Sequence, residues 1–333
     1  MYKLPVSARA KRVFAGPGWR APGWLLVVVI SGCGGGVASQ HRRAEAPPRA
    51  SSSAGPPASG RPISLASLHG RVAFSHRDDI WVADPDGRHA RRLTRGRGAE
   101  FDPSWSPDGR QIAYRDSRRG LNLDDEIYVV DAARQRRRNL TRSPSNQWSP
   151  AWSPDGRLIA FYDGQLAVMS ADGSDQHVLT KVEGEYPAWA RDGERIAFMS
   201  AEPGARGGNP NYDIFVANRD GSRLRKLTSW PGEDGWPAWS PDGHWIAFST
   251  THNAIGGARY ALYVMRADGS GKHRLPTGGE GDFPVWAPDG KTIMFSSPRD
   301  SERAEHLWVI RPDGSGLREL PLEGWLADWW GGG

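Results

Sequence analysis

Cysteine is almost absent from this sequence of 333 residues, because Cys33 is its only one. A single cysteine cannot form a disulfide within the chain, which excludes a disulfide-stapled fold. Two common catalytic signatures are missing as well: the sequence contains neither a Gly-x-Ser-x-Gly nucleophile motif nor a His-Glu-x-x-His metal motif. The sequence therefore predicts no catalytic residue, no metal site and no cofactor.

A hydrophobic run long enough to cross a membrane is also missing. The apolar stretch at residues 24–30 is far too short to span a bilayer. It follows a basic segment that includes Lys3, Arg9 and Arg12, and it leads directly into an Ile-Ser-Gly-Cys tetrapeptide that ends at Cys33. This order indicates a secretory signal rather than a membrane helix. The tetrapeptide resembles the lipobox of bacterial lipoproteins, in which the cysteine is lipidated and becomes the new N-terminus.

We therefore expect three segments. Residues 1–32 are predicted to be a lipoprotein signal peptide, and residues 33–62 a lipidated Cys33 followed by a disordered tether rich in Gly, Ala, Ser and Pro. Residues 63–333 are predicted to form the folded domain. The lipid would anchor the protein in the bacterial cell envelope, on the periplasmic face of the outer membrane in a Gram-negative host or on the outer face of the plasma membrane in a Gram-positive host.

An excess of charge of one sign is lacking once the signal is removed. The chain has 43 basic and 38 acidic residues, but five of the basic residues lie within the first 32 positions. The remaining basic side chains equal the acidic ones in number, so the high isoelectric point mostly reports the signal peptide. This balance argues against nucleic acid as a partner.

Tryptophan, in contrast, is abundant and regularly spaced. Similar segments contain a tryptophan at intervals of 47, 37, 50, 47 and 43 residues, the last of them in a weaker form. These positions are Trp105, Trp152, Trp189, Trp239, Trp286 and Trp329. A period in this range, built from short β-like segments and glycine turns, is typical of a β-propeller. The sequence predicts an all-β fold with six blades.

Each repeat predicts four strands. The innermost strand ends at the tryptophan and is followed by Ser-Pro-Asp-Gly, a sequence suited to a tight hairpin. The second and third strands alternate large and small side chains, as in residues 246–248 and 262–264. An Asp-Gly turn then leads to a polar outer strand that often ends in Leu-Thr. The aromatic side chains of these strands are expected to fill the wedges between blades.

The first and last repeats are incomplete in complementary ways. The N-terminal repeat, which begins near Gly70, lacks an inner strand, whereas residues 325–329 form an inner strand without the other three. We expect the C-terminal strand to join the N-terminal blade and so to close the ring.

The recurring pattern Pro-x-Trp-Ser-Pro-Asp-Gly, then Ile-Ala-Phe, Ile-Tyr-Val, Asp-Gly-Ser and Leu-Thr, resembles the TolB-type β-propeller repeat, a branch of the WD-repeat-like propellers. The resemblance covers nearly all of residues 70–330. The sequence differs from TolB in having the tether in place of an N-terminal α/β domain, so the partners of TolB are not carried over.

Binding residues are predicted on one face of the ring. The tight hairpins occupy one face, whereas loops of variable length, at residues 115–126, 199–213, 249–261 and 296–306, occupy the other. Aromatic and acidic residues precede the inner strands, and sixfold geometry would gather them near the channel mouth. The candidate binding face consists of Glu100, Phe101, Asp102, Trp148, Glu185, Tyr186, Asp234, Trp236, Asp282, Phe283, Glu323 and Trp325.

Two interpretations of this set stay open. The residues either form an acidic, aromatic-lined funnel for a basic peptide, a cation or a sugar, or the aromatic rings seal the blade junctions while the acids are solvated. The leading functional hypothesis is a monomeric, non-catalytic scaffold that binds an envelope protein or peptide through this funnel face.

The alternative is a carbohydrate-binding or polysaccharide-lyase-like propeller. Similar repeats occur in oligogalacturonate lyases, whose channels hold metal-binding histidines, and the inner segments of this sequence show no such cluster. A third hypothesis, a relative of the propeller that accompanies prolyl-peptidase domains, lacks a following hydrolase domain in this sequence.

Overall fold

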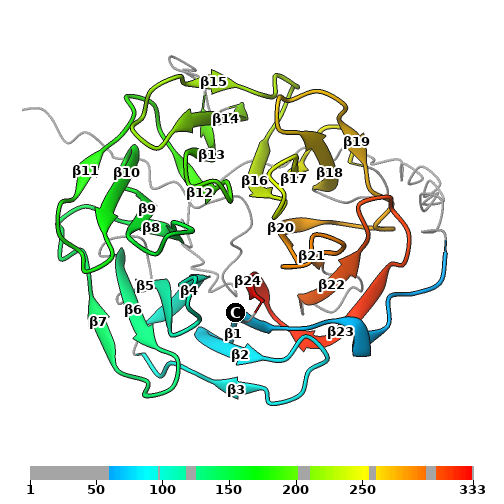
Figure 1. The fold of residues 1–333 in the computed structure, drawn as a ribbon, viewed down its shortest axis with the longest axis horizontal. Helices are drawn as coiled ribbons and strands as arrows, with labels where there is room; N and C mark the ends of the chain where they lie inside the picture. Colours follow the sequence, from blue (N-terminus) through cyan, green and yellow to red (C-terminus); the bar gives the residue numbers. More distant parts are fainter. Residues whose placement is uncertain are drawn as a thin grey trace, which may run out of the picture. The chain divides into compact units, whose positions relative to one another are not determined.

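Six four-stranded antiparallel sheets surround a central axis as the blades of a β-propeller (Figure 1). The computed structural model describes residues 60–96, 98–117, 125–201, 211–254, 260–297 and 305–331. All of them belong to the second of two compact units, Ser52–Gly333. The six-bladed fold predicted from the repeats is confirmed, whereas the predicted signal peptide, Cys33 and most of the tether lie outside the described residues.

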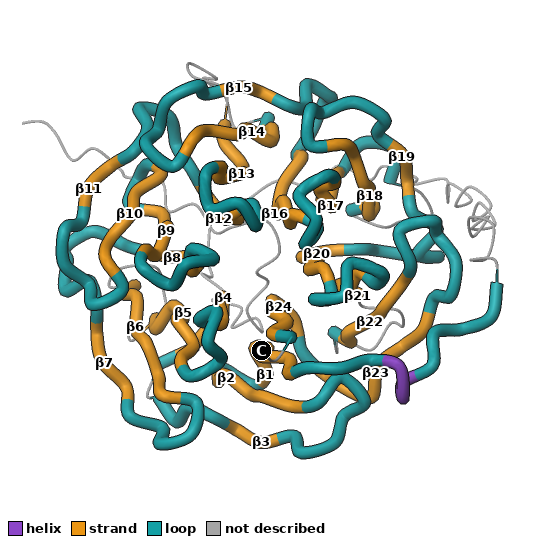
Figure 2. Tube along the Cα trace, viewed as in Figure 1, coloured by secondary structure: helices purple, strands orange, loops and turns teal. Residues whose placement is uncertain are grey.

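The strands follow one another outward from the axis in every blade (Figure 2). The inner strands are β24 (Trp325–Trp330), β4 (Ala99–Trp105), β8 (Trp148–Trp152), β12 (Glu185–Trp189), β16 (Asp234–Trp239) and β20 (Asp282–Trp286). The second strands are β1 (Arg71–His76), β5 (Gln111–Ser117), β9 (Leu158–Tyr162), β13 (Arg195–Ala201), β17 (Trp245–Thr250) and β21 (Ile293–Ser297).

The outer half of each blade is built in the same way. The third strands are β2 (Asp79–Ala83), β6 (Asp125–Asp131), β10 (Leu166–Ser170), β14 (Tyr212–Asn218), β18 (Ala261–Arg266) and β22 (His306–Ile310). The outer strands are β3 (Arg91–Arg92), β7 (Arg137–Asn139), β11 (His177–Val178), β15 (Arg225–Lys226), β19 (His273–Arg274) and β23 (Arg318–Glu323). The one helical element described is the short 3-10 turn η1 (Leu65–Ser67), and no helix within the described ranges has the length and apolarity needed to cross a membrane.

Side-chain hydrogen bonds explain the Ser-Pro-Asp-Gly turn that joins inner and second strands. In the fifth blade, the Ser240 hydroxyl donates to the Asp242 carboxylate and also accepts the backbone N–H of Trp245 at 2.9 Å. Gly243 closes the turn with φ +70°, the left-handed region that glycine enters without strain, and its N–H donates to the Ser240 carbonyl. The turn is therefore encoded locally and recurs with the motif.

The Leu-Thr ending lengthens outer strands that are very short. The N–H of Leu93 donates to the carbonyl of Ile80, and the N–H of Ile80 donates to the hydroxyl oxygen of Thr94 at 2.9 Å. Thr141 and Thr228 accept the N–H of the equivalent third-strand residues in the next blade and in the fourth blade. The threonine hydroxyl thus replaces a backbone acceptor that a two-residue strand cannot supply.

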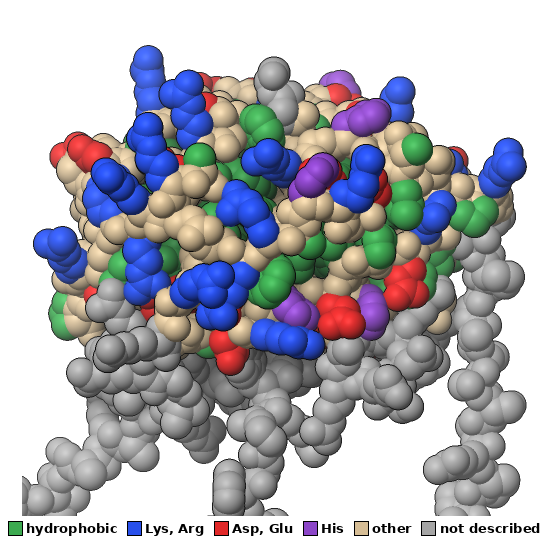
Figure 3. Space-filling view, turned by 90° about the horizontal axis from the view of Figure 1, so that it is seen from below, with side chains coloured by type: hydrophobic (Ala, Val, Ile, Leu, Met, Phe, Trp, Pro, Cys, Tyr) green, Lys and Arg blue, Asp and Glu red, His purple; other side chains and the backbone are tan. Residues whose placement is uncertain are grey.

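Basic side chains are scattered over the outer wall of the ring (Figure 3). Figure 3, which views the molecule from the side, shows lysine and arginine distributed over this wall. The outer strands contribute Arg91, Arg92, Arg137, Arg225, Lys226, Arg274 and Arg318. Charge on an edge strand opposes edge-to-edge pairing between molecules, which is how sheet proteins commonly limit aggregation.

The hydrophobic core lies between the blades rather than within any one of them. The cluster that joins the first two blades contains Ile80 and Val82 of one sheet and Trp105, Ile112 and Tyr114 of the next, all of them buried. Equivalent clusters contain Trp189, Trp239, Trp286 and Trp329. The prediction that the aromatic side chains fill the wedges between blades is confirmed.

The C-terminal strand closes the ring, as predicted. β24 pairs antiparallel with β1, placing Val72 opposite Trp329 and Ala73 opposite Asp328. The indole N–H of Trp329 also donates to the carbonyl of His69 at 2.8 Å. The first blade is therefore formed by strands from both ends of the described chain.

Removal of residues 325–333 should destabilise the whole ring. The deletion strips the partner strand from β1 and removes the buried side chains of Leu326 and Trp329, each worth about 1.5–3 kcal/mol when fully buried. We expect the free energy of unfolding in urea to fall by at least about 4 kcal/mol, and a chain shortened only by its last two glycines serves as the control. Equal denaturation midpoints for the two truncations would show that the ring closes in another way.

Candidate functional site

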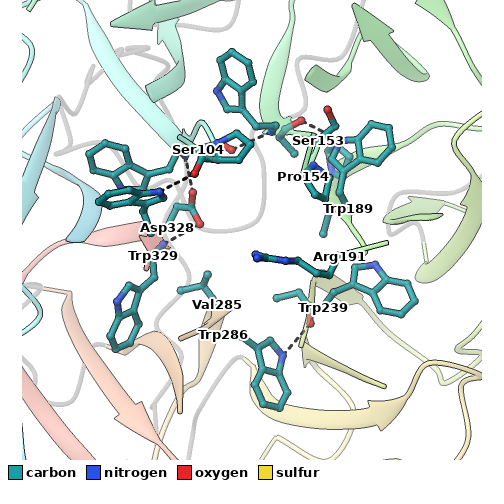
Figure 4. A pocket seen from close by; sticks show the side chains of 18 of the residues that line it. Ser104, Ser153, Pro154, Trp189, Arg191, Trp239, Val285, Trp286, Asp328 and Trp329 are labelled. Atoms are coloured by element: carbon teal, nitrogen blue, oxygen red, sulfur yellow. Dashed lines mark hydrogen bonds between the residues drawn. The ribbon is translucent and has the colours of Figure 1, made fainter. Parts of the chain in front are cut away.

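A cavity of about 960 Å³ occupies the centre of the ring (Figure 4). The six inner strands line its walls, and the turns that follow their tryptophans line its rim, among them Pro107, Pro154, Pro241 and Pro288. This central cavity therefore opens on the face of the tight hairpins. The variable loops expected to carry the binding site lie on the other face, and much of them falls outside the described residues.

A β-bulge in every blade builds the floor of the central cavity. In each inner strand the pairing with the second strand shifts near the residue three positions before the tryptophan. These six floor residues are Asp102, Ser149, Tyr186, Trp236, Phe283 and Leu326, and their φ angles lie between 47° and 54°. A residue other than glycine in this left-handed region stores on the order of 1 kcal/mol of strain, which the surrounding sheet must hold in place.

The position of the bulge also separates the six predicted aromatic residues into two groups. Counted from the tryptophan of each blade, Tyr186, Trp236 and Phe283 are floor residues, whereas Phe101, Trp148 and Trp325 lie one position earlier. The sequence pattern placed all six in one class because a one-residue offset in a strand is invisible without the pairing register. Only the first three, together with Asp102, are predicted residues that line the cavity.

Most of these rings contact one another around the axis. Trp325 lies 5.5 Å from Phe101 and 5.9 Å from Phe283 between ring centroids, and Trp236 lies 4.8 Å from Phe283. Tyr186 completes the aromatic layer, 5.7 Å from Trp236 and 6.3 Å from Phe283. Trp148 stacks instead on Tyr162, at 4.3 Å. Five of the six predicted aromatic residues are thus brought together.

Arg115 bridges the gap between Trp148 and the aromatic layer, and sequence reasoning missed it. Its guanidinium carbon lies 5.3 Å from the ring of Trp148 and 5.7 Å from that of Phe101, which suits cation–π attraction. Its Nη2 donates to Asp125 at 2.5 Å. Burial alone would lower the pKa of Arg115, but the neighbouring Asp102 and Asp125 carboxylates outweigh burial and raise it. No sequence pattern marks this residue, because it precedes a variable loop.

Asp102 lies at the floor and is only 8% exposed. Burial raises the pKa of its carboxyl group, although the nearby Arg115 guanidinium acts in the opposite direction. Its Oδ2 accepts the backbone N–H of Ser149 at 3.3 Å, whereas its Oδ1 has no hydrogen-bond partner among the described residues. Asp102 therefore lines the central cavity, but its unpartnered Oδ1 is itself buried from solvent.

The other predicted acids do not share one ring position. Glu100 and Asp234 lie five residues before their tryptophans, Glu185 and Asp282 lie four before, and Glu323 lies six before. Glu100 is fully buried against Arg137 at 2.9 Å, and Asp234 is buried and accepts the hydroxyl of Thr250. These contacts hold Glu100 and Asp234 within their own blades, whereas Glu323 is exposed.

The mouth of the central cavity carries polar groups that the repeat pattern did not single out. Arg191 replaces the proline of the tight turn in the fourth blade, and its side chain extends toward the axis (Figure 4). Arg219 lies 4.0 Å from Asp155 and 3.8 Å from Glu194. The departure from Ser-Pro-Asp-Gly at Arg191 was visible in the sequence and could have indicated a residue at the mouth.

Metal-binding side chains do not cluster in the part of the chain that the structure describes, where no group of three or more His, Cys, Asp or Glu residues could hold an ion. His89, His177 and His273 are exposed, and the latter two belong to outer strands.

The stability of the protein should depend on pH through carboxyl groups that are buried or partly buried. Burial raises the pKa of Glu185 from 4.5 to about 7, and repulsion from Glu183 and Glu233 adds to this. Burial likewise raises the pKa of Glu100 to about 7 and that of Asp234 to about 6. Because the folded chain holds these protons to a higher pH than the unfolded chain, the free energy of unfolding should fall as the pH rises from about 4.5 to about 7.

Urea denaturation between pH 4.5 and 8 measures this dependence. Glu185→Gln should reduce the fall in the free energy of unfolding over this pH range by about 1–3 kcal/mol, since each pKa unit corresponds to about 1.4 kcal/mol. Glu323→Gln, at an exposed position, serves as the matched control. A Glu185→Gln profile parallel to that of the unmodified protein would contradict the assignment.

Comparison with known proteins supports the same architecture. The family model described as the TolB beta propeller domain matches residues 162–325. A curated relative, the protein TolB homolog of Chlorobium luteolum (strain DSM 273 / BCRC 81028 / 2530), is 39% identical over 49 residues, which are 15% of this chain and 11% of that protein. The chain therefore matches only a small part of that relative.

Solved structures match over most of the ring. TolB from Acinetobacter baumannii superposes with a TM-score of 0.64 at 22% identity, covering 78% of this chain and 66% of that one. An oligogalacturonate lyase in complex with manganese superposes with a TM-score of 0.52 at 14% identity, covering 76% and 74%. At these identities the superpositions establish the fold alone. The repeats and the six closed blades show a six-bladed β-propeller, and the family model over residues 162–325 supports the TolB type.

Proposed function

We propose that this chain is a lipid-anchored protein of the bacterial cell envelope whose propeller binds a protein or peptide without catalysing a reaction. The observation that carries the proposal is the central cavity, a concave space of about 960 Å³ held open by six inner strands. A cavity of this size suits a short peptide segment or a few side chains of a partner. Its floor includes four of the residues predicted to bind: Asp102, Tyr186, Trp236 and Phe283.

Preorganisation supports a binding role. Asp328 on the cavity wall accepts the backbone N–H groups of Trp105 and Trp329, at 2.7 and 2.9 Å. Asp155 at the mouth accepts the hydroxyl of Ser153 and the N–H of Arg157. Walls fixed in this way lose little conformational entropy when a partner enters, so more of the contact energy appears as affinity.

The opposite side of the aromatic layer, toward the variable loops, is proposed as a second binding surface. Glu185 and Trp325 belong to it, with Glu183 and Glu233 close enough to Glu185 to raise its pKa. Acidic groups beside aromatic rings favour a partner with basic side chains. The protein is proposed to act as a monomer.

A glycan is the second candidate ligand. Aromatic side chains line the central cavity, as they do in many sugar-binding sites, and an oligogalacturonate lyase shares the fold. The same cavity would then hold a sugar ring against Trp236 or Phe283, and a glycan array tests this directly.

Substitution of Cys33 by alanine tests the anchor. Without the thiol there is no site for the lipid, so Cys33→Ala should leave the protein in the soluble fraction or as an unprocessed precursor after cell fractionation. Ser31→Ala, beside the same predicted cleavage site, is the control and should still be processed and retained in the membrane fraction. Retention of a mature-sized Cys33→Ala protein in the membrane fraction would reject the anchor.

Site-specific photo-crosslinking in intact cells tests the partner. A photoreactive residue at Arg191 or Asp155, both at the mouth of the central cavity, should capture the same discrete envelope protein. The control position is Val178, a residue on outer strand β11 that is 47% exposed. Equal capture at Val178, or no capture at the mouth together with specific glycan-array binding, would overturn the proposed function.

A further inference from the structure

The tryptophan near the end of each inner strand directs its backbone N–H toward the central cavity. In the fourth, fifth and sixth blades, the residue after the tryptophan donates its N–H to the second strand at 2.8 Å. These donor–acceptor pairs are Ala190–Arg195, Ser240–Trp245 and Ala287–Thr292. Because hydrogen bonds along an antiparallel pair alternate between the two edges of a strand, the N–H of the tryptophan itself points away from the second strand. The indole rings of Trp189, Trp239 and Trp286 point outward from the axis, so their backbone lies on the cavity side (Figure 4).

Side chains of the protein accept three of the six equivalent N–H groups. Oδ2 of Asp328 accepts the N–H of Trp105 at 2.7 Å, and the hydroxyl oxygen of Ser104 accepts that of Trp152 at 3.2 Å. In both cases the acceptor directly precedes the tryptophan of one blade and reaches the tryptophan of the next blade. Trp329 donates to Oδ1 of the adjacent Asp328 at 2.9 Å. A carboxylate therefore already binds two members of this ring of donors.

The other three N–H groups lack such an acceptor, and we call them the open donors. They belong to Trp189, Trp239 and Trp286. In the blade before each of them, alanine occupies the position that provides the acceptor elsewhere, and these residues are Ala151, Ala188 and Ala238. No acceptor for the open donors is found within the described ranges. A backbone N–H without a protein acceptor requires water or a ligand, so this half of the ring is available to a bound group.

Arg191 adds a positive charge beside the open donors. It follows Trp189 by two residues, is exposed, and extends toward the axis (Figure 4). The nearby Arg195 is paired with Asp192 at 2.7 Å, whereas Arg191 has no ion-pair partner in the part of the chain that the structure describes. A planar guanidinium next to a backbone N–H suits a carboxylate, which accepts hydrogen bonds at both of its oxygens.

The acidic groups that line the central cavity already have partners of their own. These partners are Ser149 for Asp102, Ser153 for Asp155, Arg195 for Asp192, Arg219 for Glu194, and the N–H groups of Trp105 and Trp329 for Asp328. A carboxylate that entered from outside would therefore meet Arg191 without displacing an acid of the protein itself.

We propose that the central cavity binds a carboxylate of the partner peptide, held by the guanidinium of Arg191 and the backbone N–H of Trp189. The inference rests on the proposed function, because it names the chemistry of the group that enters the cavity. The open donors of Trp239 and Trp286 then serve carbonyl oxygens of the same peptide. The carboxylate belongs either to the C-terminus of the partner or to an aspartate or glutamate side chain.

Isothermal titration calorimetry of the full chain, purified in detergent, tests the proposal with two matched pairs of peptides. The first pair is N-acetylated tetraglycine with a free C-terminal carboxylate and the same peptide as its amide. The second pair is a glycine pentapeptide, blocked at both ends, with a central glutamate or a central glutamine. At least one acid should bind about tenfold more tightly than its neutral counterpart. The acid that binds more tightly assigns the source of the carboxylate.

Variants locate the bound carboxylate. Arg191→Pro restores the proline that four other blades carry at this turn position, so the fold is kept, and it should weaken acid binding about tenfold or more. Ala151→Ser provides Trp189 with the acceptor that Ser104 provides to Trp152, and it should weaken acid binding several-fold. Arg223→Gln removes the same charge from an exposed turn of the same blade and should change affinity less than twofold. Thermal melts establish that each variant is folded.

Three results would overturn the proposal: equal affinity for the acids and their neutral counterparts, unchanged acid affinity in folded Arg191→Pro, or binding of trigalacturonate that the peptide acids do not displace. The last result would assign the cavity to a glycan.

The test is separable from that of the proposed function. Photo-crosslinking from position 155 leaves Arg191 in place. If capture from this position is undiminished in Arg191→Pro and the purified chain does not prefer acids, the carboxylate site alone is rejected. If the acids bind, Arg191→Pro abolishes their binding and no partner is captured, the site stands and the partner is rejected.

Discussion

The pairing of β24 with β1 is the interaction on which the rest of the structure depends. A propeller blade buries its apolar side chains only against its two neighbours, so an open ring would leave the two end blades each with one bare face. The register that sets Val72 opposite Trp329 removes both bare faces at once. Because the closing strand is held by hydrogen bonds and packing rather than by a covalent link, ring closure and folding are one cooperative event.

The six inner strands, of which β24 closes the ring, also shape its centre. In each blade the hairpin turn fixes the tryptophan end, while the bulge three residues earlier turns a side chain toward the axis. The strain of six left-handed residues is offset by the packing of the sheets around them. The result is a cavity with rigid walls and a floor whose chemistry depends on which residues occupy six positions.

The fold could be predicted from the sequence because short local motifs determine its turns and strands. The Ser-Pro-Asp-Gly turns, the alternating strands and the incomplete end repeats each carry their own physical cause, and each recurs. Only part of the candidate site could be predicted from the sequence. Tyr186 and Trp236 were found because aromatic residues stand out, but Arg115 was not, since its role arises from contacts with Asp125 and with rings on two other strands.

The face of the ring on which the cavity opens could not be predicted from the sequence, for a related reason. Loops of variable length are easy to recognise in a sequence. The depth of the channel on each side of the aromatic layer, which includes Trp236 and Phe283, depends instead on the positions of the bulges. A bulge depends on pairing between strands and leaves little trace in composition. Arg191 visibly departs from the turn motif, but it can be recognised as a cavity residue only once the structure shows that its turn lies at the mouth of the cavity.

Native-state hydrogen exchange on the β24–β1 pair measures ring closure most directly. If closure and folding are one event, the amides that hydrogen-bond across the β24–β1 pair should exchange with the same opening free energy as those of central strands such as β17. Amides of β24 that open several kcal/mol more easily than those of β17 would contradict the account, because the ring could then come apart while the blades stayed folded.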